Sequence, residues 1–312
     1  MNEYDVVVIG GGAAGLSAAL LLTRARRRVA VVDAGEPRNA PASHMHGFIG
    51  RDGTPPRDLL EAARQEVLGY GGRIVVDRAT QVRRRPDGGG LLVELARRES
   101  IGARRILVAT GLRDEVPDVP GVRERWGKDL LHCPYCHGYE VRDQPIGVLG
   151  GTPGAVEHAL LLRQWSPDVV LFPHTDNVTA EERELLVARA IGVVDGPVAR
   201  LVVSDDRLAG VELASGYVVP RAAVFVRPRM VPRTGLLQRL GFDLDDHGWP
   251  VIDANGRTSL PEVWVAGNAG NPRAQVITAA GEGSAAAIAI NADLVTEDSA
   301  RALHDFRSGL PA

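Results

Sequence analysis

The sequence of 312 residues is poor in several features, and each shortage argues against a class of protein. It has two cysteines, too few for a chain of this length to be a disulfide-stabilised scaffold. Its net charge is −3, so no strong overall field favours nucleic acid or a membrane surface as a partner. The apolar run at 13–22 is too short to span a bilayer. Lys128 is the only lysine, a compositional bias from which no function follows.

The first residues lead directly into an apolar segment without the basic stretch of a secretory signal, so we expect a cytoplasmic protein. In that compartment a lone pair of cysteines is more often catalytic than structural. The hydrophobic content of 45% and the charged content of 24% are ordinary for a globular chain. A chain of this length is expected to form about two domains.

Both cysteines lie in one short stretch, HCPYCHGYE at 132–140. The C-x-x-C spacing is typical of a redox pair, because a thiolate is a strong nucleophile and a second nearby thiol can close a disulfide. If Cys133 opens a helix, the backbone amide dipoles favour its thiolate. His137, directly after Cys136, is a candidate proton carrier. Two idle thiols and half a zinc site are the alternatives. The zinc site would need His132 and His137 as ligands, crowding four ligands into six residues.

The N-terminal segment has the full context of a dinucleotide-binding turn. Residues 5–9 suit a buried parallel strand, GGGAAG at 10–15 satisfies G-x-G-x-x-G, and a helix is expected over 16–25. A second strand at 28–32 leads to Asp33, an acid placed to accept from ribose hydroxyls. We expect FAD here, because a flavin can receive a hydride and can also exchange electrons with a dithiol.

The glycines of this turn have separate expected roles. Gly10 allows the tight turn, Gly12 allows close approach of a pyrophosphate at the helix N-terminus, and Gly15 allows close packing of helix and strand. Ala109-Thr110-Gly111, after a strand at 105–109, would also let the chain pass close to a nucleotide. A long helix from about 275 to 294 could point its N-terminus at the cofactor.

Other segments have simpler interpretations. Residues 36–56 are expected to form a ligand-covering loop, in which His44 and His46 are most simply exposed histidines. Residues 73–84 and 91–95 alternate as a small antiparallel layer, and 249–253 is expected to be a strand.

A second nucleotide-like unit follows the C-x-x-C. A strand at 145–149, a glycine turn at 150–155, a helix at 156–165 and a strand at 169–172 repeat the βαβ pattern, which predicts an α/β fold. The turn is damaged, because Thr152 replaces the glycine that a pyrophosphate would approach and Pro153 lacks an N–H. Asp176 would repel a 2′-phosphate. Use of NADPH is therefore doubtful, and a retained scaffold is the alternative.

Taken in order, these motifs resemble the low-molecular-weight thioredoxin reductase family: GGGAAG at 10–15, ATG at 109–111, C-x-x-C at 133–136, the turn at 150–155 and TSLPEVWVAGN at 258–268. The resemblance implies two Rossmann-like, three-layer α/β domains, the second inserted into the first. The FAD domain would comprise 1–114 and 232–312, and the NADPH-binding-like domain with the C-x-x-C would comprise 115–231. It also implies a homodimer.

This chain departs from the family pattern at three places. His137 stands where the reductases typically carry an aspartate, the NADPH features are degraded, and Asn268 replaces an acid that binds the flavin ribityl chain. An asparagine can still hydrogen-bond a hydroxyl. By resemblance and motif, the candidate FAD-binding residues are Gly10, Gly12, Ala13, Ala14, Gly15, Asp33, Glu36, Arg38, His46, Ala79, Ala109, Thr110, Gly111, Asn268, Gln275 and Val276.

CPYCHGYE, together with HGFIGRDG at 46–53, is more similar to the dithiol oxidases of holomycin- and gliotoxin-type biosynthesis. That resemblance implies oxidation of a small-molecule dithiol to an intramolecular disulfide, with electrons passing to FAD and then to O₂ as H₂O₂. Cys133, Cys136 and His137 would be the catalytic residues, with Cys136 nearer the flavin. An NAD(P)H-dependent reductase of thioredoxin or of a low-molecular-weight disulfide is the alternative, and a non-catalytic flavoprotein is a third.

Overall fold

The computed structural model describes residues 3–86 and 88–308, which form two compact units. The first unit contains 1–40, 56–113 and 231–312, and the second contains 41–55 and 114–230. Each is an α/β unit built around a largely parallel sheet, as the repeated βαβ pattern predicted. Within the described part of the chain, no helix combines the length and apolar character needed to cross a membrane.

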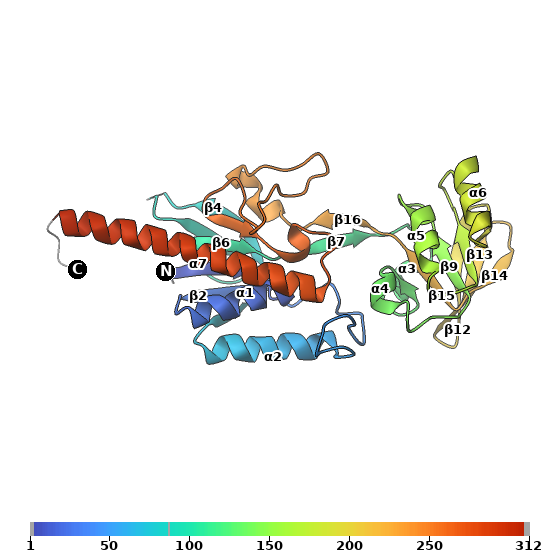
Figure 1. Cartoon of the computed structure of the whole chain (residues 1–312), viewed down its shortest axis with the longest axis horizontal. Helices are drawn as coiled ribbons and strands as arrows, with labels where there is room; N and C mark the ends of the chain where they lie inside the picture. Colours follow the sequence, from blue (N-terminus) through green and yellow to red (C-terminus); the bar gives the residue numbers. More distant parts are fainter. Residues whose placement is uncertain (1–2, 87, 309–312) are drawn as a thin grey trace. The chain divides into compact units, whose positions relative to one another are not determined.

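The first unit is organised by a seven-stranded sheet (Figure 1). Its parallel part runs in the order β3-β2-β1-β6. The second half of β6 also pairs with the parallel strand β17, and its first half pairs with the antiparallel strand β5. Strand β5 in turn pairs with β4, also antiparallel. The strands are β1 (Glu3–Ile9), β2 (Val29–Asp33), β3 (Arg73–Val76), β4 (Ala79–Arg84), β5 (Leu91–Leu95), β6 (Ile101–Val108) and β17 (Val263–Val265).

Helices α1 (Ala13–Arg24), α2 (Pro56–Gly69) and α7 (Val276–Arg307) pack on one face of this sheet, around one apolar cluster. The two 3₁₀ helices are η1 (Gly235–Leu240) and η2 (Gly267–Ala269), and residues of η1 pack with β4 and β5 on the other face. Contact between α1 and α7 is close. A Cβ at Gly283 would lie 2.0 Å from the carbonyl oxygen of Ala14, so this crossing requires glycine.

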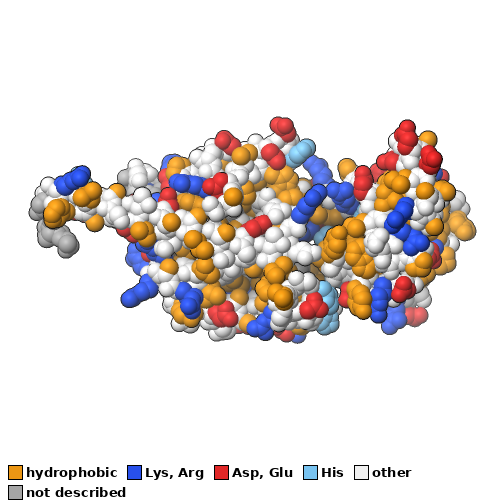
Figure 2. All heavy atoms as spheres, viewed as in Figure 1, with side chains coloured by type: hydrophobic (Ala, Val, Ile, Leu, Met, Phe, Trp, Pro, Cys, Tyr) orange, Lys and Arg blue, Asp and Glu red, His pale blue; other side chains and the backbone are white. Residues whose placement is uncertain are grey.

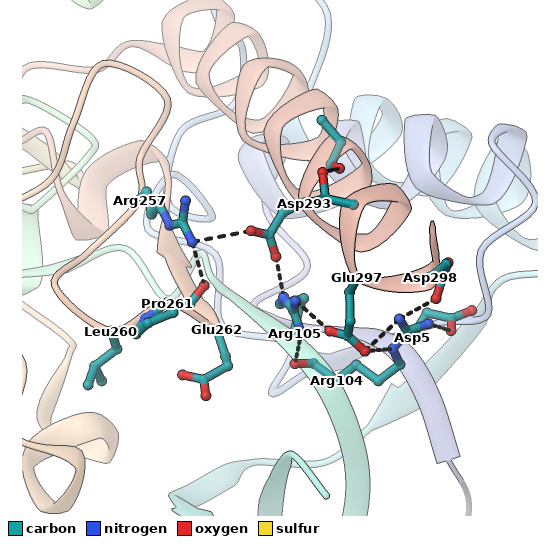
Figure 3. A network of polar contacts seen from close by, with 12 residues as sticks. Asp5, Arg104, Arg105, Arg257, Leu260, Pro261, Glu262, Asp293, Glu297 and Asp298 are labelled. Atoms are coloured by element: carbon teal, nitrogen blue, oxygen red, sulfur yellow. Dashed lines mark hydrogen bonds and ion pairs between the residues drawn. The ribbon is translucent and has the colours of Figure 1, made fainter. Parts of the chain in front are cut away.

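Ion pairs fasten α7 to β6 beyond this crossing (Figure 3). Arg105 Nε lies 2.6 Å from Asp293 Oδ2, and its Nη2 lies 2.6 Å from Glu297 Oε2. Arg104 reaches Glu297 and Asp298 one turn further along the helix. These contacts hold α7 beyond residue 294, where the small-residue pattern suggested an end, and the helix runs on to Arg307.

The second unit has a five-stranded parallel sheet in the order β11-β10-β9-β15-β8, with α5 (Ala155–Leu162) and α6 (Ala180–Ala188) packed on one face and a three-stranded antiparallel meander on the other. Short helices α3 (Val122–Arg125) and α4 (Pro134–His137) flank β8. Strands β7 (Leu112–Glu115) and β16 (Arg229–Pro232) pair where the chain passes between the units. The remaining strands are β8 (Leu130–Leu131), β9 (Ile146–Leu149), β10 (Val169–Phe172), β11 (Gly192–Val193), β12 (Val198–Ser204), β13 (Arg207–Leu213), β14 (Val218–Pro220) and β15 (Ala223–Val226).

The structure differs from the sequence expectations in three places. The loop 41–55 belongs to the second unit, although the expected division placed it in the first. The run 73–84 breaks at Asp77, whose buried carboxylate accepts the backbone N–H groups of Arg78 and Arg97, so β3 joins the parallel sheet instead of an antiparallel layer. The segment 249–253 forms one isolated bridge and no strand, because turns around Asp245 and Asp253 bound it on both sides.

Candidate functional site

The redox stretch forms a disulfide between Cys133 and Cys136 at the start of α4. Cys133 is the N-cap residue, and its carbonyl accepts the backbone N–H groups of Cys136 and His137. Pro134 occupies the first helical position, where a missing N–H costs no hydrogen bond. The C-x-x-C therefore opens a helix as expected, though one of a single turn. Oxidised cysteines are not thiolate ligands, and no group of three or more potential metal ligands occurs among the described residues.

Aromatic rings surround this turn. The Tyr135 ring meets Trp165 edge to face at 5.5 Å, and a Cβ at Gly138 would lie 3.0 Å from the same indole. The side chains of Tyr135 and Tyr139 are exposed on either side of Cys136. The disulfide therefore lies next to exposed aromatic surface on which a small organic substrate can pack.

His137 directly follows Cys136 and is the last residue of α4. Its Nδ1 is buried and has no hydrogen-bond partner. Burial lowers the pKa of His137, Glu140 opposes this shift, and His46 adds to it. The imidazole is consequently neutral at neutral pH and able to accept a proton.

Two further histidines, His132 and His158, lie where the chain leads from β8 into the redox turn. His132 stacks on Trp126, with ring centroids 5.4 Å apart. His158 of α5 donates to the backbone of His132, and burial lowers the pKa of His158 to about 4. A neutral His158 thus orients the residue before Cys133 and is too weak a base to exchange protons near neutral pH.

The first glycine turn has the geometry of a pyrophosphate cradle. Gly10 has φ +113°, and a Cβ there would lie 2.2 Å from the carbonyl oxygen of Ala109. A Cβ at Gly15 would lie 1.9 Å from the carbonyl oxygen of Gly10, whereas one at Gly12 would project into open space. Gly12 is the N-cap of α1, so no side chain accepts a hydrogen bond from the first backbone amides of this helix. The first turn, which includes Ala13 and Ala14, also contains no acidic residue. The free amides and the positive end of the helix dipole can therefore bind an external anion, as FAD binding requires.

Candidate residues also follow the ends of β2 and β3 in the first unit, and Asp33 lies beside the glycine turn. Asp33 at the end of β2 bonds Gly35 N and pairs with Arg64 at 2.9 Å, and a carboxylate with two such partners can still accept from a ribose. Glu36 pairs with Arg78, and the hydrogen bond from Arg78 lowers the pKa of Glu36. Ala79 begins β4, after the end of β3.

The amide of Asn268 is fixed in one orientation. Its Nδ2 donates to the carbonyls of Asn271 and Ala274, both at 2.9 Å. Both carbonyls can only accept hydrogen bonds, so the amide must turn its Nδ2 toward them. Its Oδ1 then lies on the other side, 3.5 Å from Arg38 Nη1. This oxygen can accept a hydrogen bond from a hydroxyl group, as a carboxylate oxygen would. Glu282 holds the same turn through Gly267 N and Asn271 Nδ2.

The remaining candidate flavin residues are also at the carboxyl edge of this sheet or next to it. Ala109 N donates to the carbonyl of Ile9, Thr110 Oγ1 donates to the carbonyl of Arg233, and Gly111 has φ +69°. Gln275 is the N-cap of α7, and Val276 is its first residue. His46 alone among the candidates lies in the second unit, where it contacts Asp52 and Glu140.

Replacing Gly12 with alanine should weaken FAD binding about tenfold, or ~1.4 kcal/mol, because the methyl group would project into the phosphate cradle. The measurement is the FAD dissociation constant of the apoprotein. Gly69→Ala, at the exposed end of α2 where an added Cβ would also meet open space, is the control for a glycine change outside the cradle. Equal affinity in Gly12→Ala and the wild type would remove this turn from the flavin site.

The second glycine turn is occupied by the chain's own groups. Asp176 Oδ2 accepts Gly151 N at 2.8 Å, and Thr152 Oγ1 donates to the carbonyl of Arg227 at 2.5 Å. The Arg227 guanidinium lies against the start of α5, where a Cβ on Gly154 would be 2.0 Å from Nη1. Beside this turn is a pocket of about 420 Å³. Three carboxylates line it, Glu157, Asp176 and Glu182, and none of its described lining residues is basic.

Sequence reasoning left out several residues that shape these sites: Arg64, Arg227 and Glu282, and also Glu140 and Asp52 beside His46. Glu140 lies within the quoted redox stretch and Asp52 within HGFIGRDG, so a search for acids near the C-x-x-C and in that loop would have found both. The other three are far in sequence from the groups they contact and gave no local signal.

Known proteins match this chain along most of its length. A family model for pyridine nucleotide-disulphide oxidoreductases matches residues 4–283. The crystal structure of HlmI is 58% identical and covers 97% of this chain and 96% of its own, with a TM-score of 0.95. Thioredoxin reductase aclD of Aspergillus oryzae is 28% identical over 96% of this chain and 98% of its own.

A probable thioredoxin reductase of Arthroderma benhamiae is 32% identical over 186 residues, which are 58% of this chain and about half, 46%, of that protein. The matched family consists of FAD-binding flavoproteins. From the match, the disulfide and the fold together, the chain belongs to the pyridine nucleotide-disulphide oxidoreductases and is a thioredoxin reductase-like oxidoreductase.

Proposed function

We propose that this enzyme uses FAD to oxidise a small-molecule dithiol to an intramolecular disulfide, with O₂ as electron acceptor. One observation carries the direction of the reaction: the pocket of the second unit is lined by three carboxylates and by no basic side chain among its described residues. A 2′-phosphate there would be repelled. An oxidase needs no nicotinamide, whereas a reductase does. The resemblance of CPYCHGYE to dithiol oxidases supports the same direction.

The chemistry begins at Cys133. A substrate thiolate attacks Cys133 Sγ, the Cys133–Cys136 bond breaks, and its electron pair leaves on Cys136 as a thiolate. The second substrate thiol gives its proton to His137, and its sulfur attacks the substrate sulfur bound to Cys133. The cyclic disulfide departs, Cys133 becomes a thiolate, and the enzyme retains two electrons in its reduced pair.

The glycine turn, Asp33 and Asn268 would hold FAD, which when bound would supply the two-electron acceptor for the reduced pair and the route to O₂. The Cys133–Cys136 bond re-forms as the two electrons leave, and two electrons with two protons convert O₂ to H₂O₂. The sum is dithiol plus O₂ giving disulfide plus H₂O₂. We propose that the first unit is the FAD domain and that the second, with the loop 41–55, carries the redox pair.

Anaerobic flavin spectroscopy tests the proposal. Dithiothreitol, a model dithiol, should bleach the bound flavin within seconds, while NADPH and NADH should bleach it at least about a hundred times more slowly. Admitting air should restore the colour and produce one H₂O₂ per flavin. Fast bleaching by either nicotinamide would instead establish a reductase.

The alternative is an NAD(P)H-dependent disulfide reductase. Arg227 favours it, because a guanidinium at the start of α5 can bind a phosphate. The name thioredoxin reductase carried by relatives favours it as well. Under this alternative, Arg227→Ala should slow bleaching by NADPH. Under the oxidase proposal, it should leave bleaching by dithiothreitol unchanged.

We also propose a homodimer, in which α7 supplies part of the interface. Four exposed apolar residues of α7, at spacings of seven, eight and three, lie on one face: Ile288, Val295, Leu303 and Phe306. Hydrophobic side chains are visible at the C-terminal end of this helix (Figure 2). An apolar stripe of this length on a helix usually has a partner.

In sedimentation, the protein should have twice the mass of one chain. Phe306→Glu should weaken the dimer about tenfold, because a carboxylate would replace an exposed ring that the dimer would bury. His304→Glu, on the opposite side of the same helix, is the matched control. A Phe306→Glu protein as dimeric as the control would exclude α7 from the interface.

A further inference from the structure

The short helix η2 lies beside the phosphate cradle of the first unit. Gly267 opens η2 with φ +67°, and a Cβ there would lie 2.9 Å from the Cβ of Ala14, in the first turn of α1. Gly283 of α7 meets the same turn, since its Cβ would lie 2.0 Å from the carbonyl oxygen of Ala14. A side chain carried by η2 is therefore placed next to the backbone amides that would bind the FAD phosphates.

Glu282, the residue before Gly283, holds η2 from the side of α7. Its Oε2 accepts the backbone N–H of Gly267 at 2.9 Å, and its Oε1 accepts Asn271 Nδ2 at 2.7 Å. Both carboxylate oxygens therefore face N–H donors, one at each end of the turn that carries Asn268. The backbone N–H of Asn271 also donates to the carbonyl of Gly267 at 2.9 Å, which closes that turn.

The orientation of the Asn271 amide is fixed in the same way as that of Asn268. Asn271 Oδ1 accepts the backbone N–H of Arg273 at 3.0 Å, so its Nδ2 must face Glu282. The backbone carbonyl of Asn271 accepts Asn268 Nδ2, as the carbonyl of Ala274 does. The hydrogen bonds thus connect Glu282 through Asn271 to Asn268, and they leave Asn268 Oδ1 as the acceptor that can meet a cofactor hydroxyl.

We propose that Glu282 is a positioning residue for FAD, and that the turn it holds requires an amide at position 268. This rests on the proposed place of FAD in the first unit. Asn271 transmits the constraint, because its side chain is held by Glu282 and its carbonyl holds Asn268. An acid at 268 would place an oxygen against two carbonyl oxygens and would have to turn away from them. This turn therefore selects the amide over the acid of the related reductases.

The dissociation constant of FAD, measured with the apoprotein and without substrate, tests the proposal. Glu282→Gln should weaken FAD binding about tenfold, because a glutamine has one acceptor oxygen and must turn its NH₂ toward Gly267 N or Asn271 Nδ2. Asn271→Asp should weaken it at least as much, since two carboxylates would face each other across the 2.7 Å contact. Glu66→Gln, at an exposed glutamate of α2, is the control and should bind FAD as the wild type does.

The double variant Glu282→Gln/Asn271→Asp separates positioning from a general loss of stability. In it the glutamine NH₂ donates to the new carboxylate, the glutamine oxygen still accepts Gly267 N, and the net charge is unchanged. FAD affinity should return to within about threefold of the wild type, and the visible circular dichroism of the bound flavin should return with it. A double variant that binds FAD no better than Glu282→Gln, or a Glu282→Gln protein with wild-type affinity, would overturn the proposal.

Asn268→Asp is a second test that leaves Glu282 intact. FAD binding should become about tenfold weaker, although this change restores the acid of the related reductases. Asn255→Asp, exposed in the turn at 253–257, is the matched control. Equal or tighter binding in Asn268→Asp would overturn the requirement for an amide.

These binding constants do not depend on the direction of catalysis. Restored FAD binding in the double variant, together with fast flavin bleaching by NADPH in the wild type, would uphold the positioning role of Glu282 and reject the oxidase.

Discussion

Replacing Cys136 with serine is expected to abolish dithiol turnover while leaving FAD bound. The hydroxyl cannot close a disulfide with Cys133, so the substrate thiolate has no S–S bond to attack and the two electrons have no carrier. Loss of a nucleophilic pair of this kind typically costs at least about 10³-fold in rate. The candidate flavin residues apart from His46 belong to the first unit, so the flavin spectrum and the flavin-to-protein ratio should match those of the wild type.

The measurement is H₂O₂ production with dithiothreitol under air, together with the flavin content of the purified variant. Tyr135→Phe is the matched control, because it changes the residue between the cysteines, keeps both sulfurs and keeps the ring contact with Trp165. It should retain activity within about threefold, since only an exposed hydroxyl is removed. Wild-type turnover by Cys136→Ser would reject the disulfide mechanism.

The parallel cores could be predicted from sequence because their strands are continuous apolar runs. Val6, Val7 and Val8 are buried on both faces of β1, and the same pattern marks β9 and β15. The glycine turns could be located for a related reason: they follow these strands directly, and only glycine fits beside the carbonyl of Ala109. Features of this kind can be recognised from residues that are adjacent in the sequence.

Features that depend on distant partners could not be predicted. The loop 41–55 carries no periodicity, and its place in the second unit follows from contacts such as His46 to Glu140. The expected strand at 249–253 failed because Asp245 and Asp253 accept local backbone N–H groups, which compete with sheet pairing. The orientation of the Asn268 amide likewise needs two carbonyls supplied by the fold.

A His137→Asn variant is expected to lose about 10²-fold in the rate of flavin bleaching by dithiothreitol at pH 7, the usual contribution of a positioned general base. Asparagine keeps a polar side chain of similar reach but cannot accept the proton of the second substrate thiol. FAD binding and the Cys133–Cys136 disulfide should be unaffected, and His44→Asn serves as a control for a histidine change in an exposed loop.

The pH dependence follows from the environment of the ring. Burial lowers the pKa of His137 from its ordinary value of 6.5, so the neutral, proton-accepting form persists to lower pH than in an exposed histidine. Because the base works in its neutral form, the wild-type rate should fall as the pH drops through that pKa, in addition to a rise at high pH from ionisation of the dithiol. In His137→Asn this acidic limb should vanish, leaving only the slower rise at high pH that reflects ionisation of the dithiol itself. An acidic limb that survives in the variant would assign the proton to another group, and Glu140 is the nearest acid in the chain to examine next.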